Sequence, residues 1–187
     1  MHILDTERLR IRQLRASDAK FYLGLLNEPS FHKYIGDKGI RDEEGACQHL
    51  MQGPIKSYQC NGFGVYLVCL KPSDSQRLGT EENEDEVQES EIPIGICGLV
   101  KRVELDLPDL AAAFKPDYWR SGYAFEAALS ILNFDTKKYQ LDEILAVARV
   151  HNSASQQYVS KLGFIKEDVR PITSGGEDFV WFRRRST

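Results

Sequence analysis

The stretch from residue 110 to residue 148 constrains the fold most, because patterns typical of strands and of a helix alternate in it. It starts with a short strand at residues 110–114 and a loop that contains glycine. A helix follows, whose small and apolar residues repeat on one face. The run at residues 144–148 then has the apolar character of a buried strand. We therefore expect an α/β fold.

More strands are predicted on both sides of this stretch. Residues 8–14 alternate polar and apolar side chains, which predicts the first strand. Two runs rich in β-branched residues, 64–70 and 94–100, are expected to pair as a hairpin. Residues 164–165 and 179–182 provide two closing strands.

Three more helices are predicted, the first of them from apolar residues at helical spacing. The first begins after Ser17, which can serve as its N-cap, and the second begins after Asp42 and ends near Gly53. The third covers residues 153–162 and ends at Gly163, a left-handed C-cap.

The length of 187 residues suits a single domain over residues 1–187, with 42% hydrophobic and 28% charged residues. An acidic insertion at about residues 72–92 interrupts it. This segment cannot bury enough apolar surface to offset its ordering entropy. We interpret it as a mobile surface insertion, with an acidic docking site as the alternative. Seven of its carboxylates are Glu81, Glu82, Glu84, Asp85, Glu86, Glu89 and Glu91.

The sequence argues against several classes of partner. No run approaches the ~18 apolar residues of a membrane span, and the first residues lack the order of a signal peptide, so we expect a cytoplasmic protein without a membrane partner. The cysteines show no C-x-x-C spacing, which predicts free thiols and no metal. No basic stripe with interleaved aromatics suggests nucleic acid. We expect a monomer or a weak dimer.

The loop at residues 119–124 is the first candidate site. Unpaired backbone N–H groups at a helix N-terminus bind anions, and small residues let a phosphate approach. A plain turn is the alternative. The loop reads Trp119-Arg120-Ser121-Gly122-Tyr123-Ala124.

The second candidate site follows the buried strand at residues 144–148. Asn152 lies at the end of the strand and Ser155 lies one turn into the next helix. Both side chains can face a cleft at the carboxyl end of the strand. The alternative is that both residues are helix caps.

With the first candidate site preceding the second along the sequence, the chain resembles the GNAT acetyltransferase superfamily. The resemblance is closest to its ribosomal-protein-alanine acetyltransferase (RimJ/RimL-like) branch. The resemblance covers nearly the whole chain. It rests on matches to the branch's T-E-R-L…D, x-I-G-x-x-G, Y-W-G-K-G-Y-A-T-E-A and N-x-x-S…K-L-G-F segments. The matching residues are Thr6-Glu7-Arg8-Leu9 with Asp18, residues 94–98, residues 118–127 and residues 152–164.

The resemblance implies a single GNAT-type domain: a twisted, mixed and largely antiparallel sheet flanked by helices, with acetyl-CoA between the central strands. Backbone N–H groups of the loop would hold the pyrophosphate, and the strand near Phe114 would splay from its neighbour and pair with the pantetheine arm. Asn152 would bind the pantetheine, and Ser155 would protonate the departing thiolate. The implied cofactor-binding residues are Phe114, Trp119, Arg120, Ser121, Gly122, Tyr123, Ala124, Asn152, Ser155 and Tyr158.

The chain departs from the family pattern at three positions. Trp119 takes the place of a glutamine or arginine, and Arg120 replaces a glycine common in this branch. The tyrosine that many GNAT enzymes use as general acid falls at Val159, and Tyr158 lies roughly 100° around the helix from it. We therefore expect Ser155 to be the proton donor.

Other titratable residues are less informative. Asp109 aligns with an acidic position of the family and is a candidate general base, with a solvated strand-edge carboxylate as the alternative reading. Glu126 is expected to be a structural hydrogen-bonding residue. His32, His49 and His151 are expected to be surface or capping residues.

The resemblance implies an acetyl-CoA-dependent N-acetyltransferase that acts on a primary amine, either a protein N-terminus or a small molecule, without a metal. The alternative is a non-catalytic acyl-CoA-binding or interaction module on the same fold. In this family the first two helices and the later strand loops select the acceptor. Neither residues 31–59 nor residues 171–177 identify it.

Overall fold

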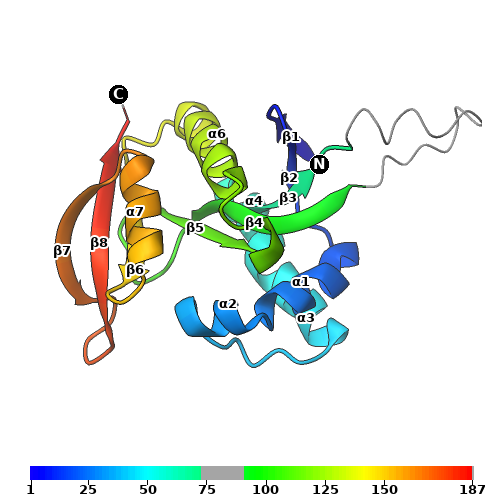
Figure 1. The fold of residues 1–187 in the computed structure, drawn as a ribbon, viewed down its shortest axis with the longest axis horizontal. Helices are drawn as coiled ribbons and strands as arrows, with labels where there is room; N and C mark the ends of the chain where they lie inside the picture. Colours follow the sequence, from blue (N-terminus) through cyan, green and yellow to red (C-terminus); the bar gives the residue numbers. More distant parts are fainter. Residues whose placement is uncertain (73–90, 187) are drawn as a thin grey trace, which may run out of the picture.

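The computed structural model describes residues 1–72 and 91–186 and contains an eight-stranded sheet with helices on both faces (Figure 1). The strand order is β1-β2-β3-β4-β5-β6-β8-β7, and only β5 and β6 pair in parallel within the described residues. The predicted mixed, largely antiparallel sheet is confirmed. The strands are β1 (His2–Asp5), β2 (Leu9–Gln13), β3 (Val65–Leu70), β4 (Ile92–Val100), β5 (Asp109–Phe114), β6 (Glu143–Arg149), β7 (Ile165–Pro171) and β8 (Asp178–Arg185).

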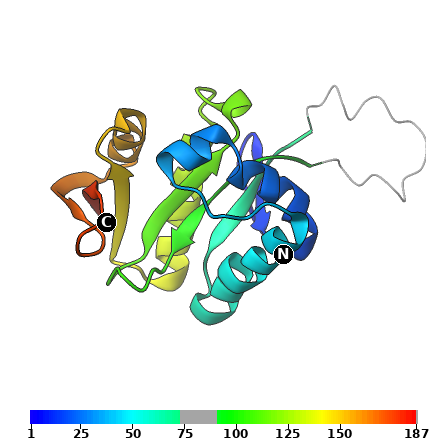
Figure 2. The ribbon, with the colours of Figure 1, turned by 90° about the horizontal axis from the view of Figure 1, so that it is seen from below.

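The helices form two layers (Figure 2). On one face, α6 and α7 enclose the main core, to which they contribute Ile131, Leu132 and Val159. On the other face, α1, α2 and α3 enclose a second core with Leu67 and Ile96 of the sheet. The helices are α1 (Ala19–Leu26), α2 (Pro29–Tyr34), α3 (Glu43–Leu50), α4 (Lys56–Asn61), α6 (Tyr123–Tyr139) and α7 (Ser153–Lys161), with short turns η1 (Ala16–Asp18), η2 (Met51–Ile55) and η3 (Pro116–Tyr118).

The parallel strands β5 and β6 are joined at one end and separate at the other (Figure 2). Asp109 pairs with Leu145, and the Leu145 N–H donates to the Pro108 carbonyl at 2.9 Å. The ladder between the two described strands goes no further. The edge of β5 toward Phe114 is therefore not paired with β6, in agreement with the splaying that the resemblance implies.

Four local features differ from the sequence-based expectations. The strand β1 precedes the predicted first strand, and α2 was not predicted; both are too short to show a clear period. Ser17 lies inside η1, and Asp18 takes the N-cap position of α1. The helix that Asp42 caps, α3, ends at Leu50, but the chain stays helical past Gly53, because a π-helical turn, η2, accommodates Pro54 and leads into α4.

Most of the predicted acidic insertion lies outside the described residues, but its carboxyl end belongs to the fold. The Glu91 Oε2 atom accepts a hydrogen bond from Arg12 Nε at 2.7 Å, and β4 begins at Ile92. The other end of the Arg12 guanidinium binds both carboxylate oxygens of Asp18 at 2.9 Å. This ion-pair cluster ties Glu91 to β2 and to the turn before α1.

Candidate active site

The loop between β5 and α6 has an uncommon backbone conformation. Trp119 Nε1 donates to the Phe114 carbonyl at 2.8 Å, which ties the loop to the end of β5. Arg120 has a φ of +61° and Gly122 a φ of +83°. The left-handed backbone at Arg120 gives a reason for the glycine that the family commonly has there, since any other residue costs about 1 kcal/mol in this conformation.

The helix α6 begins with N–H groups that no helical carbonyl can satisfy. Its first helical hydrogen bond joins Glu126 N to the Gly122 carbonyl at 3.0 Å. The N–H groups of Tyr123, Ala124 and Phe125 precede this bond and lack a helical acceptor. Because α6 has 17 residues, its dipole adds positive potential at this end. The loop therefore has the geometry of an anion-binding helix N-terminus.

Below the loop, Glu126 binds the chain that leads into β2. Its Oε1 accepts from Thr6 Oγ1 at 2.5 Å and from Arg8 N at 3.0 Å, and its Oε2 accepts from Arg8 Nε at 2.7 Å. Burial raises the pKa of Glu126, but these hydrogen bonds outweigh it and keep the pKa below the usual value. The predicted structural role of Glu126 is confirmed. These contacts also give a physical reason for the T-E-R-L match.

The start of α7 contains both residues of the second candidate site. Asn152 Oδ1 accepts from the Ser155 N–H at 3.1 Å, so Asn152 caps the helix as the alternative reading expected. Ser155 is half-buried and is not a cap. Within the described part of the chain, its hydroxyl group forms no hydrogen bond.

Tyr158 connects the two candidate sites. Its hydroxyl donates to the Ala124 carbonyl in the first turn of α6 at 3.1 Å. Burial raises the pKa of Tyr158 well above its usual value, so the hydroxyl keeps its proton at neutral pH. Val159, at the family's tyrosine position, is buried in the main core. Of these two neighbours, Tyr158 is therefore the residue that extends from α7 toward the loop.

Asp109 lies where β5 and β6 are joined, and its side chain is 0% exposed. The expectation of a solvated strand-edge carboxylate is wrong, because β5 is flanked there by β4 and β6: Asp109 pairs with both Val100 and Leu145. Burial raises the pKa of Asp109 to about 6, and Arg102, whose Nε donates to Oδ1 at 2.9 Å, partly opposes the shift.

Comparisons with known proteins identify the family of the chain. A family model described as an acetyltransferase (GNAT) domain matches residues 8–165. The chain belongs to the GNAT acetyltransferase family. It is 25% identical over 167 residues to the uncharacterized N-acetyltransferase YoaA of Bacillus subtilis, an alignment that covers 89% of this chain and 85% of the relative.

Solved GNAT structures share the fold. An acetyltransferase (GNAT family) from Bacillus anthracis is 24% identical, with a TM-score of 0.72 over 99% of this chain and 98% of that one. RimL, a ribosomal L7/L12 alpha-N-protein acetyltransferase in complex with coenzyme A, is 12% identical, with a TM-score of 0.77 over 99% and 98% of the chains. At these identities the structures support the fold alone. As a member of the GNAT family, the chain is an acyltransferase.

On the α2 side of this GNAT domain, Arg149 connects the two segments that the resemblance links to acceptor choice. Its Nε donates to the Tyr34 carbonyl at the end of α2 at 3.3 Å, and its Nη1 forms an ion pair with Glu177 in the loop before β8. The guanidinium lies 5.7 Å from the centre of the Phe179 ring. The end of α2 and the β7–β8 loop therefore meet at the carboxyl end of β6.

The histidines have partners that the sequence did not reveal. His49 Nδ1 lies 3.0 Å from the Tyr22 hydroxyl, and burial lowers its pKa, so His49 is not simply a surface residue. The His151 ring lies 6.5 Å from the ring of Tyr34. His32 Nε2 lies 3.6 Å from Asp37. None of these contacts involves a predicted site residue.

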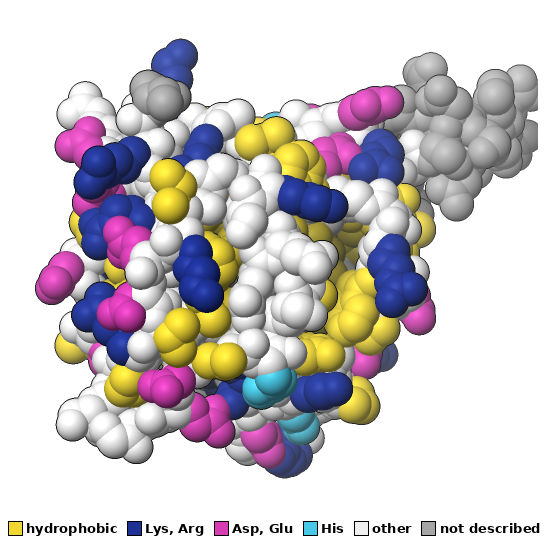
Figure 3. All heavy atoms as spheres, turned by 60° about the vertical axis from the view of Figure 1, so that its left-hand side comes forward, with side chains coloured by type: hydrophobic (Ala, Val, Ile, Leu, Met, Phe, Trp, Pro, Cys, Tyr) yellow, Lys and Arg dark blue, Asp and Glu magenta, His cyan; other side chains and the backbone are white. Residues whose placement is uncertain are grey.

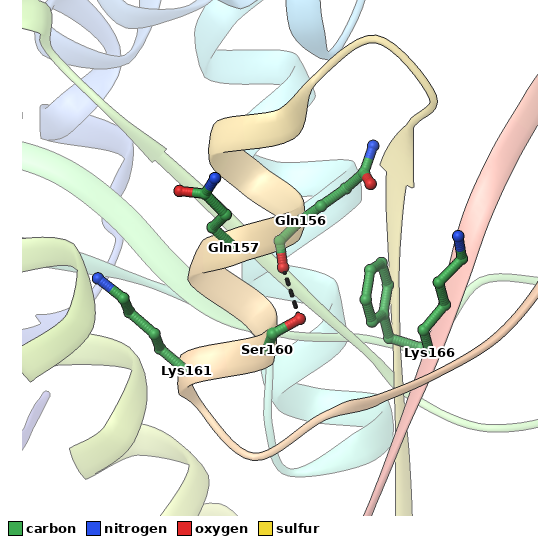
Figure 4. Close-up of a pocket in the computed structure, with 6 residues that line it drawn as sticks. Gln156, Gln157, Ser160, Lys161 and Lys166 are labelled. Carbon is green, nitrogen blue, oxygen red and sulfur yellow. Dashed lines mark hydrogen bonds between the residues drawn. The ribbon is translucent and has the colours of Figure 1, made fainter.

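An open hollow lies between α7 and the β7–β8 hairpin, and no predicted site residue lines it. In Figure 4, Gln157 and Lys161 project from the side of α7 that is away from Lys166. The Ser160 hydroxyl donates a hydrogen bond to the Gln156 carbonyl at 2.9 Å. The hollow is lined by Gln156, Gln157, Ser160, Lys161, Lys166 and Phe182.

Among residues 1–72 and 91–186, no group of three or more histidine, cysteine or acidic residues is placed to hold a metal ion. In the same residues, no helix combines the length and apolar character needed to cross a bilayer. Basic and acidic side chains are interspersed on the face drawn in Figure 3.

Proposed function

We propose that this GNAT domain transfers an acetyl group from acetyl-CoA to a primary amine. The observation that carries the proposal is the start of α6, where three N–H groups without helical acceptors follow a glycine in the left-handed conformation. Close approach of a phosphate requires a bare backbone, and a Cβ at Gly122 would lie 3.2 Å from Arg8 Nη2. The residues present fit the pyrophosphate of coenzyme A.

Bound acetyl-CoA would supply an acetyl group activated as a thioester. In the proposal, the N–H groups of residues 120–124 hold the pyrophosphate, and the unpaired edge of β5 near Phe114 holds the pantetheine together with Asn152. Trp119 contributes by fixing the loop to β5. This positioning, and stabilisation of the developing oxyanion by backbone N–H groups, supply most of the acceleration.

Ser155 is the proposed proton donor to the departing sulfur. Its hydroxyl is half-buried at the start of α7 and is not committed to another described residue. The hydroxyl of Tyr158, by contrast, already donates to the Ala124 carbonyl. Val159 has no proton to give.

We assign removal of the amine proton to water and not to Asp109. A pKa of about 6 would suit a base, but a base must also reach the proton it removes. The Asp109 carboxylate is fully buried, and one of its oxygens is bound by Arg102. The burial of Asp109 therefore supports a structural role at the joined end of β5 and β6.

The acceptor is proposed to be a protein N-terminus or a small primary amine. Relatives in fold act on both classes: RimL is named for ribosomal L7/L12, and a structure from Vibrio cholerae is a spermidine N-acetyltransferase with coenzyme A and spermine, 16% identical with a TM-score of 0.69 over 96% of each chain. In this chain, the end of α2 and the β7–β8 loop are the proposed acceptor side, because Arg149 joins them there.

An acetylation screen tests the proposal. The protein is incubated with acetyl-CoA and two panels, small primary amines and peptides with free N-termini, and the products are identified by mass spectrometry. We expect at least one acetylated amine and an equal amount of free coenzyme A. Thermal stabilisation by coenzyme A without any consumption of acetyl-CoA would instead support the non-catalytic binding module. Absence of coenzyme A binding would refute the cofactor assignment.

A further inference from the structure

Two negative groups, the Glu126 carboxylate and a bound phosphate, would compete for the positive potential at the start of α6. The Glu126 carboxylate lies in the first turn of α6, four residues after the N-cap Gly122, which is about 6 Å along the helix axis. A carboxylate at this position is attracted by the same helix dipole that would attract a phosphate. Its distance from the loop is also shorter than a Debye length, so a phosphate held there would be repelled by Glu126.

Arg8 is placed to remove this conflict. Its guanidinium forms an ion pair with Glu126 at 2.6 Å, and the two side chains are 43% and 19% exposed. The same guanidinium donates from Nη1 to the Ser121 carbonyl at 2.9 Å and lies 4.5 Å from the centre of the Tyr123 ring. One cation therefore contacts the carboxylate, a carbonyl of the loop and the first residue of α6.

The contact at Ser121 also orients the loop. A peptide carbonyl that points toward Arg8 leaves the N–H group on the opposite side of the same peptide pointing away from Arg8, because the peptide unit is planar and trans. That N–H belongs to Gly122, whose φ of +83° sets up the start of α6. Arg8 thus holds the carbonyl away from the side on which backbone N–H groups would meet an anion.

From these contacts we propose that Arg8 is a positioning residue of the cofactor loop: it neutralises Glu126 and holds the Ser121 carbonyl, so that the start of α6 remains free to bind the pyrophosphate. This inference rests on the proposed function of the loop. Neither Arg8 nor Glu126 is given a role in the chemical step.

The experiment compares four variants, Arg8→Gln, Arg8→Lys, Glu126→Gln and the double variant Arg8→Gln/Glu126→Gln. The matched control is Arg10→Gln, which removes the same charge two residues further along the chain, in β2, where the arginine has its ion pairs with Asp5 and Glu91. Affinity for coenzyme A is measured by calorimetry at low and high salt. Hydrogen exchange of residues 119–126 is measured on the protein without ligand.

We expect Arg8→Gln to weaken coenzyme A binding about tenfold at low salt, because Glu126 is no longer neutralised. The loss should be smaller at high salt, because the salt screens the repulsion between Glu126 and the phosphate. The double variant should recover most of the affinity, since the repelling charge is gone. Arg8→Lys, which keeps the charge and loses the planar fork, should fall between Arg8→Gln and the wild type. Arg10→Gln should bind within about twofold of the wild type.

Two results would overturn the proposal: an Arg8→Gln variant that binds coenzyme A like the wild type, or a double variant that binds no better than Arg8→Gln. If Arg8→Gln does not fold, Arg8→Lys takes its place, and an Arg8→Lys variant that binds coenzyme A like the wild type overturns the proposal. A wild-type chain that does not bind coenzyme A refutes the proposed function. The positioning role is then judged by hydrogen exchange alone. At residues 119–126 the exchange must be faster in both Arg8→Gln and Glu126→Gln than in the wild type.

Discussion

At the scale of single residues, the hydroxyl groups of Ser155 and Tyr158 are on the same helix but in different states. The Tyr158 hydroxyl is hydrogen-bonded to the Ala124 carbonyl and belongs to a partly buried ring, whereas the Ser155 hydroxyl has no partner among the described residues. A group that must give up its proton during the reaction should not depend on that proton for a structural contact. This difference favours Ser155 as the donor.

Ser155→Ala should lower kcat by roughly 10²-fold or somewhat less, because a thiolate with an intrinsic pKa near ~8.5 also leaves partly without help. Affinity for acetyl-CoA should change little, since the interaction is made mainly in the transition state. Steady-state kinetics and calorimetry measure the two effects. Tyr158→Phe is the comparison: a larger loss of kcat in Tyr158→Phe than in Ser155→Ala would transfer the donor role to Tyr158.

Asp135 is a buried acid that the sequence did not single out. It lies inside α6, is 0% exposed and accepts a hydrogen bond from the Tyr66 hydroxyl at 3.1 Å, while its Oδ2 has no hydrogen-bond partner among the described residues. Burial raises the pKa of Asp135 to about 7, and the bond from Tyr66 only partly opposes this shift. The folded protein therefore favours the neutral acid.

A pKa raised in the folded state makes the free energy of unfolding fall as pH increases from about 4, the value for an unfolded Asp, to about 7, and stay level above that. Asp135→Asn should remove this loss. It should raise the free energy of unfolding by roughly 4 kcal/mol above pH 7 and have little effect near pH 4. Urea unfolding across this pH range measures it, with the exposed Asp142→Asn as control. A pH-independent difference would show that Asp135 is not the titrating group.

At the scale of elements, the connection from β5 to α6 depends on a backbone conformation that a side chain disfavours. Gly122→Val places a β-branched residue at a φ of +83° and a Cβ near Arg8, so it should weaken coenzyme A binding at least tenfold, about 1.4 kcal/mol. Gly39→Val is the matched control, since Gly39 has a φ of +71° and open space around it. Both variants should lose thermal stability, but only Gly122→Val should lose affinity.

Calorimetry with coenzyme A and thermal unfolding separate these two effects. If both variants lose affinity equally, the loss reflects general strain, and the loop has been misassigned. If neither variant loses affinity, the anion is not held at the start of α6.

At the scale of the whole molecule, the acidic insertion is expected to be separable from the fold. Replacing residues 73–90 with a short Gly/Ser turn should leave the melting temperature and acetyl-CoA affinity nearly unchanged, because loop length has a small effect on closure entropy. Glu91 must be retained, since it binds Arg12. Differential scanning calorimetry measures the stability. Glu91→Gln, which breaks this ion pair, should lower the melting temperature; a larger loss in the replacement would mean that the segment packs or docks.

The sequence by itself determined most of the elements and the place of the site along the chain. Periodicity located β2 and α6, since a strand with one buried face or a helix with one buried stripe repeats that geometry in consecutive residues. Runs of apolar or β-branched residues located β3, β4 and β6. The glycine before α6 and the asparagine before α7 are also local signals, because each satisfies a backbone requirement within a few residues.

Only the tertiary structure decided which distant residues meet. Arg8 and Glu126 are 118 residues apart, and neither shows a local sign of the other. Asp109 is a buried carboxylate because β4 and β6, which lie before and after β5 in the sequence, both pair with β5 there. Tyr158 contacts the start of α6, and its neighbour Val159 packs in the core. Local patterns specify backbone geometry and the buried face, whereas the environment of a charge or hydroxyl depends on how whole elements are packed against one another.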